Sequence, residues 1–500
     1  MSKGKALTAR AKPKPKPKVA LSTGFSRPTS PLPTALPPSR VHASAYHYPL
    51  MLDDESAIKE LLRWFESIEE ARNMPWRKKW LDPAAFVGKE EEFGKLLEKR
   101  AYEVWVSEVM LQQTRVSTVI PYFNNWISKW PTVQALAEAS HDDVLSVWKG
   151  LGYYSRATRL HEGAKAVVTN SGSNICKVPS SVKALQEIPG IGRYTAGAVS
   201  SIAFGEAEPV LDGNVARVLS RQLGLYIDAK DKKSTDVLWD VADQLIKNVA
   251  GFPEKGSSVV PGQWNQALME LGSTICTPKP KCGECPIRAT CRVYAEGESL
   301  ARKKAVPTAI PDIEDACSLC HQLDTEDLAT APDDVSDDED SAVEEKPTKR
   351  RKTAPKKQAN TLSNYFTSIT PSKPKTAPSD PENEDSAAPS TKNPQPTPSA
   401  KVIPYCALFP KKVPKKAVPE QDALVCIIEA RRPNGKSEFL IEQRPAKGLL
   451  ASLWQFPQST LPDTKSDSAT RKAAAQAFVA GLEIPGVHDA GYDVGAKVSS

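Results

Sequence analysis

The sequence predicts a mostly helical protein with a two-lobed core, a four-cysteine metal-binding subdomain, a long linker and a smaller α+β domain. Three observations lead to this fold class. A Pro-Gly-Ile-Gly turn stands between two apolar segments near residue 190, a strongly apolar helical segment surrounds residue 108, and four cysteines lie within residues 276–291. With 43 prolines among 500 residues, much of the chain is expected to lie outside packed cores.

Composition limits the class of protein. No apolar run is long enough to span a bilayer and the N-terminus has no apolar signal segment, so a soluble intracellular protein is expected. Four of the nine cysteines form one compact group, which favours a metal site in a reducing compartment over a disulfide framework. The net charge of +6, with clustered basic residues, permits a polyanionic partner without requiring one.

The N-terminal arm, residues 1–50, is rich in Lys, Pro and Ser, and its lysines from Lys12 to Lys18 alternate with proline. Because this alternation blocks both helix and sheet, the arm is predicted to be disordered. Its charge suits nonspecific nucleic-acid binding or a targeting signal, and a solvated tail is the plainer explanation.

The core is predicted to span residues 51–275 and to begin with a helix near Ala57, where apolar side chains recur at helical spacing. This helix leads into Arg-Asn-Met-Pro-Trp-Arg at residues 72–77, whose aromatic ring and planar cations suit the wall of a site for a stacked base. Residues 78–100 are charged and are interpreted as an insertion.

The next predicted helix, residues 102–118, leaves little polar surface around Glu108. Burial disfavours the charged carboxylate and raises its pKa, as a general acid at neutral pH requires. The alternative is a glutamate that faces solvent from the wet stripe of a core helix. This helix alone does not decide between the two.

Residues 188–196 read Ile-Pro-Gly-Ile-Gly-Arg-Tyr-Thr-Ala, and the apolar segments 182–185 and 196–204 predict two helices packed across this turn, a helix-hairpin-helix. Glycine backbone and a helix N-terminus together suit a phosphate. Asp212 follows at the start of a helix predicted over 215–223, a position expected to lower its pKa. An ordinary turn and cap explain either feature alone. Glu108 and Asp212 together predict an acid and a charge stabiliser at one site.

Cys276, Cys282, Cys285 and Cys291 define a cluster loop over 276–295, and their spacing fits tetrahedral zinc or an iron–sulfur cluster equally. Residues 296–400 are predicted to form a mostly disordered linker. It carries an acidic run at 333–345, and a basic run at 349–352 that is typical of a nuclear localisation signal.

The linker holds two further motifs. Cys317-x2-Cys320-His321 supplies two or three zinc ligands, although free surface thiols explain it equally well. Leu362-x2-Tyr365-Phe366 is similar to the core of a sliding-clamp binding motif, with its glutamine one place off. Strand-like runs follow at 424–428 and 439–442.

Four blocks, at residues 107–114, 119–123, 150–156 and 211–215, resemble the adenine DNA glycosylase (MutY) family of the helix-hairpin-helix superfamily, which removes adenine mispaired with 8-oxoguanine. The resemblance covers roughly residues 51–295 and resumes near 420. It implies base flipping, protonation of the adenine by Glu108, and an oxocarbenium-like sugar stabilised by Asp212, with support from Tyr194 and Asn214. Further DNA-binding residues are expected at Arg72, Trp76, Arg77 and Glu270 around the base, Gln113 and Tyr153 as wedges, Pro189, Gly190 and Gly192 in the hairpin, and Trp454.

The resemblance also implies cofactors and a second domain. The family places a [4Fe–4S] cluster at the four cysteines, with six residues between the first two where this chain has five. Some members hold zinc in the linker, here implied at Cys317 and Cys320. Residues 401–500 resemble a Nudix-like domain that reads 8-oxoguanine, and residues 471–478 lack the glutamates of a Nudix hydrolase, so binding without hydrolysis is predicted. This domain is expected to be truncated.

The predicted enzyme is a monomeric, monofunctional hydrolase of the nucleus, with the mitochondrion as a second location, acting on duplex DNA with adenine opposite 8-oxoguanine or guanine. Two rivals remain open: an endonuclease III-like glycosylase/lyase and a catalytically inactive damage-binding protein. The first needs a lysine where this chain has Tyr194, directly after the hairpin Gly-Arg pair. Both carboxylates are present, which disfavours the second rival.

Overall fold

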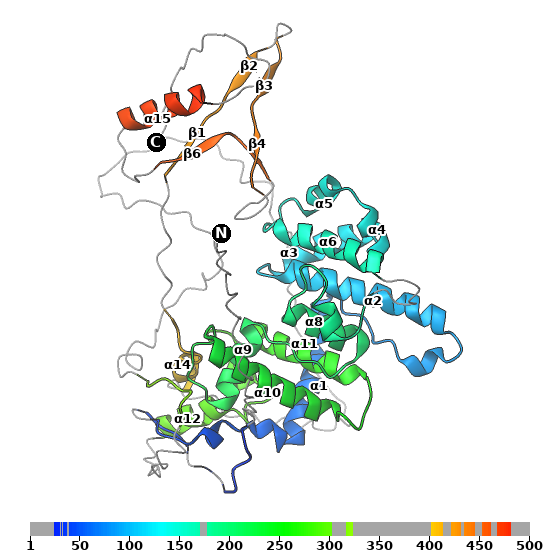
Figure 1. Ribbon diagram of the computed structural model, residues 1–500. Helices are drawn as coiled ribbons and strands as arrows, with labels where there is room; N and C mark the ends of the chain where they lie inside the picture. The colour runs from blue at the N-terminus through cyan, green and yellow to red at the C-terminus, as the bar shows by residue number, and fades with distance from the viewer. Residues whose placement is uncertain are drawn as a thin grey trace, which may run out of the picture. The chain divides into compact units, whose positions relative to one another are not determined.

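The computed structural model describes residues 25–30, 32, 34–37, 40–170, 178–302, 317–323, 402–413, 422–431, 435–445, 453–461 and 468–481, shown in Figure 1. The linker motifs at 349–352 and 362–366 lie outside these residues and stay predictions. Within the described part, no helix is both long and apolar enough to cross a membrane.

The helical core is built from twelve described α-helices with short 3-10 turns between some of them (Figure 1). Its elements are η1 (Ser44–His47), η2 (Leu50–Leu52), α1 (Glu55–Arg72), η3 (Pro83–Phe86), α2 (Glu90–Leu111), α3 (Val116–Lys129), α4 (Val133–Glu138), α5 (His141–Trp148), α6 (Ser155–Asn170), α7 (Val182–Leu185), α8 (Arg193–Phe204), α9 (Gly213–Leu223), α10 (Lys232–Ala250), α11 (Val259–Thr274), η4 (Cys282–Glu284) and α12 (Arg292–Ala301).

Helices α3 to α6 gather in one lobe, α1 and α9 to α12 gather in the other, and α2 and α8 connect them (Figure 1). The apolar face of each helix contributes to one continuous core, which contains the fully buried indole rings of Trp105, Trp126, Trp148 and Trp264. Because fully burying a large apolar side chain contributes about 1.5–3 kcal/mol, these rings fix how the helices pack.

The predicted hairpin helices are confirmed as α7 and α8, and the helix after Asp212 is confirmed as α9. The prediction of one helix over residues 102–118 is wrong. Helix α2 starts earlier, at Glu90, and ends at Leu111, so half of the predicted insertion extends this helix. It ends there because Gln113 adopts left-handed backbone geometry, with φ of 54°, and α3 begins only at Val116.

The predicted disordered arm ends earlier than residue 50. From Arg40 onward the chain packs against α12, where the buried Glu296 carboxylate accepts hydrogen bonds from Arg40 at 2.7 and 3.1 Å and from the Tyr46 hydroxyl at 2.9 Å. These bonds satisfy the charge of a carboxylate that has no solvent exposure. Tyr46 is also buried, so this part of the arm belongs to the core.

Helix α14 (Val402–Ala407) follows the linker and packs against α12 in a second, smaller apolar cluster. The Tyr405 hydroxyl donates to Glu296 at 2.5 Å, and the Arg221 guanidinium donates to the Phe409 carbonyl at 3.0 Å. Residues 402–413 therefore form part of the helical core, although the linker separates them from it in sequence.

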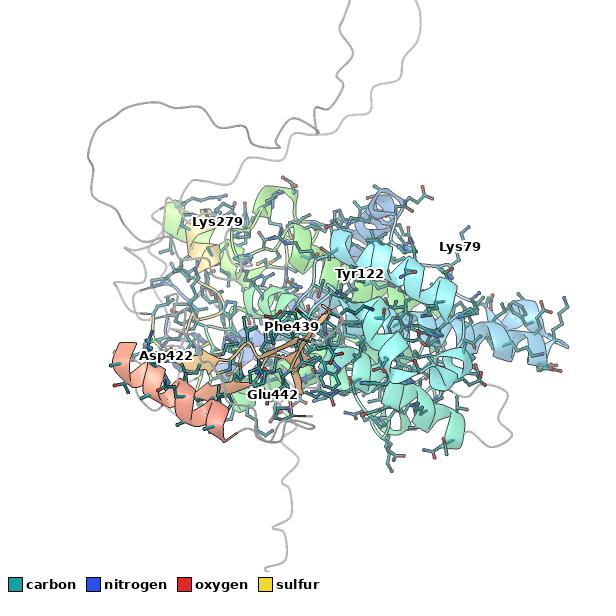
Figure 2. All side chains as sticks on the ribbon, turned by 90° about the horizontal axis from the view of Figure 1, so that it is seen from above. Lys79, Tyr122, Lys279, Asp422, Phe439 and Glu442 are labelled. Carbon is teal, nitrogen blue, oxygen red and sulfur yellow. The ribbon has the colours of Figure 1, made fainter. Side chains whose placement is uncertain are left out.

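The C-terminal region contains short antiparallel strand pairs and one helix: β1 (Ala423–Val425) with β6 (Gln458–Thr460), β2 (Glu429–Arg431) with β3 (Ser437–Phe439), β4 (Glu442–Gln443) with β5 (Trp454–Gln455), and α15 (Ser468–Ala480). The predicted run 424–428 overlaps only β1, and the run 439–442 spans the break between β3 and β4. Several apolar side chains of these strands are exposed, including Phe439, which Figure 2 labels together with Glu442.

Candidate active site and metal centres

Glu108 lies in α2 and is buried, with 6% of its surface exposed. Burial and, to a smaller degree, the nearby charge of Asp212 raise the pKa of its carboxyl to about 7, although a hydrogen bond from Tyr194 and the charge of Arg77 act to lower it. The carboxyl can therefore carry a proton at neutral pH, as the sequence predicted from its apolar surroundings.

Tyr194, in the first turn of α8, connects the hairpin to this carboxyl. Its hydroxyl donates a hydrogen bond of 2.7 Å to Oε2 of Glu108 and lies 3.0 Å from Sδ of Met269. Burial and the charges of Glu108 and Asp212 raise the pKa of the phenol well above its usual range, so it stays neutral and remains a donor. A residue of the hairpin thus directly contacts the candidate acid.

Asp212 is the N-cap of α9, and its carboxylate accepts hydrogen bonds from the Val215 amide at 2.7 Å and from Nδ2 of Asn214 at 2.9 Å. The expected lowering of its pKa is nevertheless wrong. Desolvation by burial raises this pKa more than Val215, Asn214 and the charge of Arg217 lower it. The cap position alone misses this because a helix terminus stabilises charge by only about 0.3–1 kcal/mol at an exposed site.

Arg217 is a residue whose role sequence reasoning missed. Its guanidinium donates to Oδ1 of Asn214, to the Gly272 carbonyl and to the Cys276 carbonyl, each at 2.8 Å. A side chain at Gly272 would collide with Asn214, because an added Cβ would lie 2.7 Å from its Cβ. Close packing of α9 on α11 therefore joins the Asp212 cap to the first cysteine of the cluster loop.

Glu270 on α11 is buried and lies between two arginines. Nε of Arg72 lies 2.9 Å from one of its oxygens and the Arg77 guanidinium 2.6 Å from the other. The structure brings these three predicted residues together. Trp76 is buried beside them and packs edge-on against Phe123, with ring centroids 5.3 Å apart.

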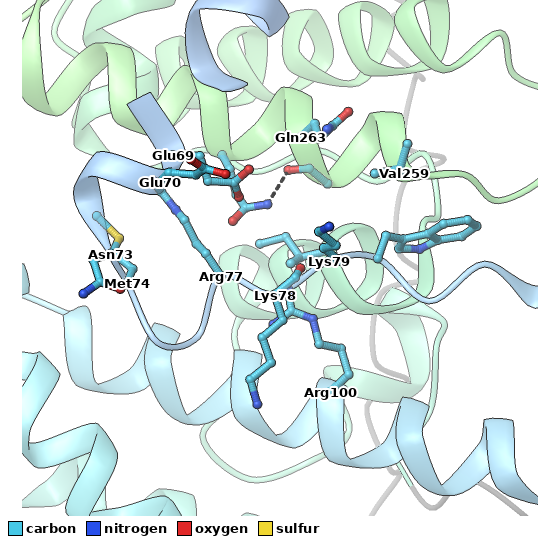
Figure 3. Close-up of a pocket in the computed structure, with 14 residues that line it drawn as sticks. Glu69, Glu70, Asn73, Met74, Arg77, Lys78, Lys79, Arg100, Val259 and Gln263 are labelled. Carbon is cyan, nitrogen blue, oxygen red and sulfur yellow. Dashed lines mark hydrogen bonds between the residues drawn. The ribbon is translucent and has the colours of Figure 1, made fainter. Parts of the chain in front are cut away.

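A pocket of about 670 Å³ opens beside Arg77, between the segment after α1 and the start of α11 (Figure 3). Lys78, Lys79 and Arg100 give it a basic side, and Lys79 reaches the surface (Figure 2). Glu108, Tyr194 and Asp212 do not line this pocket. The titratable groups of these three residues interact with one another, so the structure brings the predicted acid, phenol and stabiliser together outside this pocket.

The two predicted wedge residues share an unusual backbone. Gln113 and Tyr153 have φ of 54° and 47°, a left-handed conformation that costs energy for residues other than glycine, and Tyr153 is 55% exposed. Strain at exposed positions is common where a surface is shaped for a ligand.

Arg156 holds both wedge loops. The four N–H groups of its two terminal nitrogens share six acceptors on residues 109–114 and 151–152, at distances of 2.7–3.3 Å. Its charged group also lies 5.5 Å from the ring of Tyr153. Sequence reasoning quoted this arginine only as part of a motif, and its density of bonds to loop carbonyls could not be read from spacing.

The hairpin turn presents Pro189, Gly190 and Gly192 at the surface. Gly190 has φ of 84°, and an added Cβ would lie 2.8 Å from Cβ of Arg159, so the turn requires glycine there. Gly192 is the N-cap of α8, with open space around it. In the C-terminal region, Trp454 of β5 is 64% exposed.

The four cysteines of the cluster loop line one cavity between α9, α11 and α12. Arg221 donates to Sγ of Cys276 at 3.3 Å and to the carbonyls of residues 276–278. Burial and repulsion from Cys276 raise the pKa of Cys285 to about 12, and burial raises that of Cys291 well above its usual range. The thiolate forms of these two cysteines therefore need a bound cation, and the group of four can bind metal. Lys279 of the same loop is exposed (Figure 2).

A second candidate metal site is formed by His42, His47, Cys317 and Cys320, whose ligand atoms all lie within 4.8 Å of one another. Nδ1 of His47 bonds to the Leu223 carbonyl at 2.8 Å, which directs Nε2 toward the other three candidate ligands, at 3.0–3.5 Å. His321, the third ligand considered from sequence, is not part of this group. The spacing His42-x4-His47 could have indicated the missing ligands, but the arm that contains it was expected to be disordered.

The chain is similar to known DNA repair proteins. Residues 106–243 match the HhH-GPD superfamily of base excision DNA repair proteins. The chain is 36% identical to the adenine DNA glycosylase of Rattus norvegicus, over 84% of this chain and 63% of the relative. It is 35% identical to that of Homo sapiens, over 87% and 62%, and 31% identical to that of Schizosaccharomyces pombe, over 83% and 72%. The chain thus spans less than two thirds of the two mammalian relatives.

Proposed function

This chain belongs to the adenine DNA glycosylase family, and we propose that it hydrolyses the N-glycosidic bond of adenine mispaired with 8-oxoguanine or guanine in duplex DNA. The observation that carries this proposal is the buried Glu108 carboxyl, with a pKa near 7, beside Tyr194 and Asp212. A base that leaves a sugar needs a proton, and the sugar needs a negative partner as it becomes cationic.

In the proposed reaction the target nucleotide is flipped out of the duplex and Glu108 gives its proton to the adenine. Asp212 stabilises the positive charge that develops on the sugar, and Asn214, Val215 and Arg217 hold it in place. Tyr194 orients Glu108 through its 2.7 Å hydrogen bond. Water then completes the hydrolysis.

DNA contacts are assigned to the residues around this centre. Arg72, Trp76, Arg77 and Glu270 would surround the flipped base, and Gln113 and Tyr153 would fill the space it leaves. The glycine turn at 189–192 and the N-terminus of α8 would hold a phosphate.

The test is base release in single turnover from duplexes with adenine opposite 8-oxoguanine, guanine or thymine. We expect release of adenine opposite 8-oxoguanine and opposite guanine. Asp212→Asn should abolish this release and retain duplex binding. A near wild-type rate in that variant would refute the assignment and favour a different stabiliser. Binding without any release by the unmodified chain would favour the inactive damage-binding alternative.

We propose that the enzyme releases the base without cutting the strand. A lyase forms a Schiff base through an amine next to the opened sugar, and the side chain at the hairpin position is the phenol of Tyr194. Borohydride trapping of the unmodified protein on the mispaired duplex should yield no abundant adduct, and nicks should need alkali. Trapped adduct and alkali-independent nicking would support the endonuclease III-like alternative.

The four-cysteine site is proposed to hold a [4Fe–4S] cluster. The proposal is supported by the four cysteines, which all line one cavity, and by the family's cluster at the matching positions. The cluster would contribute a compact, folded loop; iron and sulfide analysis of purified protein tests this, and zinc without sulfide would refute it.

The site of His42, His47, Cys317 and Cys320 is proposed to bind zinc, whose preferred ligands are these nitrogen and sulfur donors in a tetrahedron. It would tie the N-terminal arm to the segment 317–323. The chain is further proposed to act in the nucleus as a monomer, with mitochondrial action as a second location. Sliding-clamp binding through Leu362, Tyr365 and Phe366 stays a proposal from sequence.

The C-terminal strands are proposed to read 8-oxoguanine, with exposed Trp454 as a contact. Because residues 402–413 pack in the helical core, the deletion that tests this begins at residue 422. Loss of preference for 8-oxoguanine over guanine, with excision retained, is the expected result. Equal discrimination with and without residues 422–500 would refute it.

A further inference from the structure

A fifth cysteine stands at the four-cysteine site. Cys406, in α14, is 1% exposed, belongs to the small apolar cluster against which Cys282 and Cys291 pack, and lines the same cavity as the four cysteines of the cluster loop. In sequence it lies more than 100 residues after Cys291, beyond the linker, so spacing gives no indication that it belongs to this site.

The position of Cys406 is fixed by bonds on both sides of it. Tyr405 donates to Glu296 at 2.5 Å, and the Phe409 carbonyl accepts from Arg221 at 3.0 Å. Farther on, the Lys411 amide donates to the Ile227 carbonyl at 3.0 Å. Arg221 is the same side chain that bonds to the cluster loop, so α14 and that loop share one buried anchor.

Burial limits the protonation state and the hydrogen bonds of the Cys406 thiol. A buried cysteine that is not a metal ligand keeps its proton, and an S–H group is a weak donor that needs a charged acceptor to bond well. The sulfur of Cys282 becomes such an acceptor when it is a thiolate ligand. A hydrogen bond to a ligand sulfur withdraws negative charge from it and raises the reduction potential of an iron–sulfur cluster.

We infer that Cys406 is a positioning and tuning residue of the cluster site, whose S–H donates to the ligand sulfur of Cys282. This inference rests on the [4Fe–4S] cluster proposed above. It gives the segment after the linker a role at the metal site: α14 covers the cluster loop and supplies one hydrogen bond to it.

The experiment uses the full chain and compares the unmodified protein with Cys406→Ala, Cys406→Ser and Cys426→Ala. Cys426 is a matched control because it is a partly exposed cysteine of the C-terminal region. Iron and sulfide per chain, the electron paramagnetic resonance spectrum and the midpoint potential by protein-film voltammetry are measured. Circular dichroism checks the fold, and the serine variant keeps a donor should the alanine variant fold poorly.

All four proteins should hold equal iron and sulfide. Cys406→Ala should lower the equilibrium constant for one-electron reduction of the cluster about tenfold. This corresponds to a midpoint potential that is lower by about 59 mV. Cys406→Ser should fall between Cys406→Ala and the unmodified protein, and Cys426→Ala should not change the potential.

An unchanged potential in Cys406→Ala, with the cluster intact, would overturn the inference. Loss of iron together with a changed resonance spectrum would also overturn it, since Cys406 would then be a ligand. Zinc without sulfide in the unmodified chain would refute the cluster itself and with it the inference, so metal analysis of that protein separates the two failures.

Discussion

Glu108→Gln tests the buried carboxyl through stability as well as through activity. The folded protein holds the pKa of this group near 7, whereas an unfolded chain leaves it near 4.5. A raised pKa in the folded state means that folding disfavours the charged form. The fold therefore loses stability as the pH rises from about 4.5 through about 7, and glutamine, which cannot ionise, avoids this loss.

The size of the effect follows from the pKa difference. At 1.36 kcal/mol per pH unit, the difference between 4.5 and about 7 gives a cost of about 3 kcal/mol once the pH exceeds both values. At pH 5.5 the same relation gives a loss of only about 1.4 kcal/mol in the free energy of unfolding. The glutamine variant should thus gain about 2 kcal/mol relative to the unmodified protein between pH 5.5 and pH 8.5.

Urea unfolding of both proteins at pH 5.5, 7 and 8.5 measures this gain, and single-turnover excision should fall about 10²–10⁴-fold in the same variant. Glu103→Gln is the matched control. Glu103 is also buried in α2, but it is paired with Lys78 at 2.6 Å, so its neutralisation should cost stability. The raised pKa of Glu108 would be refuted if Glu108→Gln did not increase the free energy of unfolding at pH 8.5, or if the increase did not grow with pH.

Four further outcomes are expected. Single-turnover excision by the unmodified chain should fall above about pH 7, and Tyr194→Phe should move this fall to higher pH, because its hydroxyl lowers the pKa of Glu108; an unmoved profile would contradict that role. Asp212→Asn should abolish excision and retain duplex binding, which gel-shift titration checks against the rate. Arg156→Lys should lower the free energy of unfolding by about 2–3 kcal/mol and weaken duplex binding, since buried acceptors lose their donors; wild-type values for both would contradict the role of Arg156 in holding the wedge loops. His47→Ala should remove one zinc per chain by elemental analysis without loss of iron, and equal zinc in both proteins would exclude that site.

The sequence predicted those parts of the site that depend on short-range patterns. The apolar residues around Glu108 lie on its own helix and made its burial one of two interpretations, which the presence of Asp212 then favoured, and the glycine turn predicted the hairpin. The pKa of Asp212 was predicted in the wrong direction because burial by distant helices outweighs the local cap. Arg217 and Cys406 escaped notice for the same reason: their partners lie on segments that only the folded chain brings near them.

Helices α12 and α14 pack together, so the linker between them begins and ends at the helical core and is a loop in this sense. The distance between the helical core and the C-terminal strands is limited by the eight residues between Val413 and Asp422, which cannot span more than about 30 Å at full extension. Such a short connection would keep the C-terminal strands, proposed above to read 8-oxoguanine, at a high local concentration beside the helical core. Changes in the length of the loop should leave this concentration unaltered, whereas each residue added to the short connection should dilute these strands around the helical core.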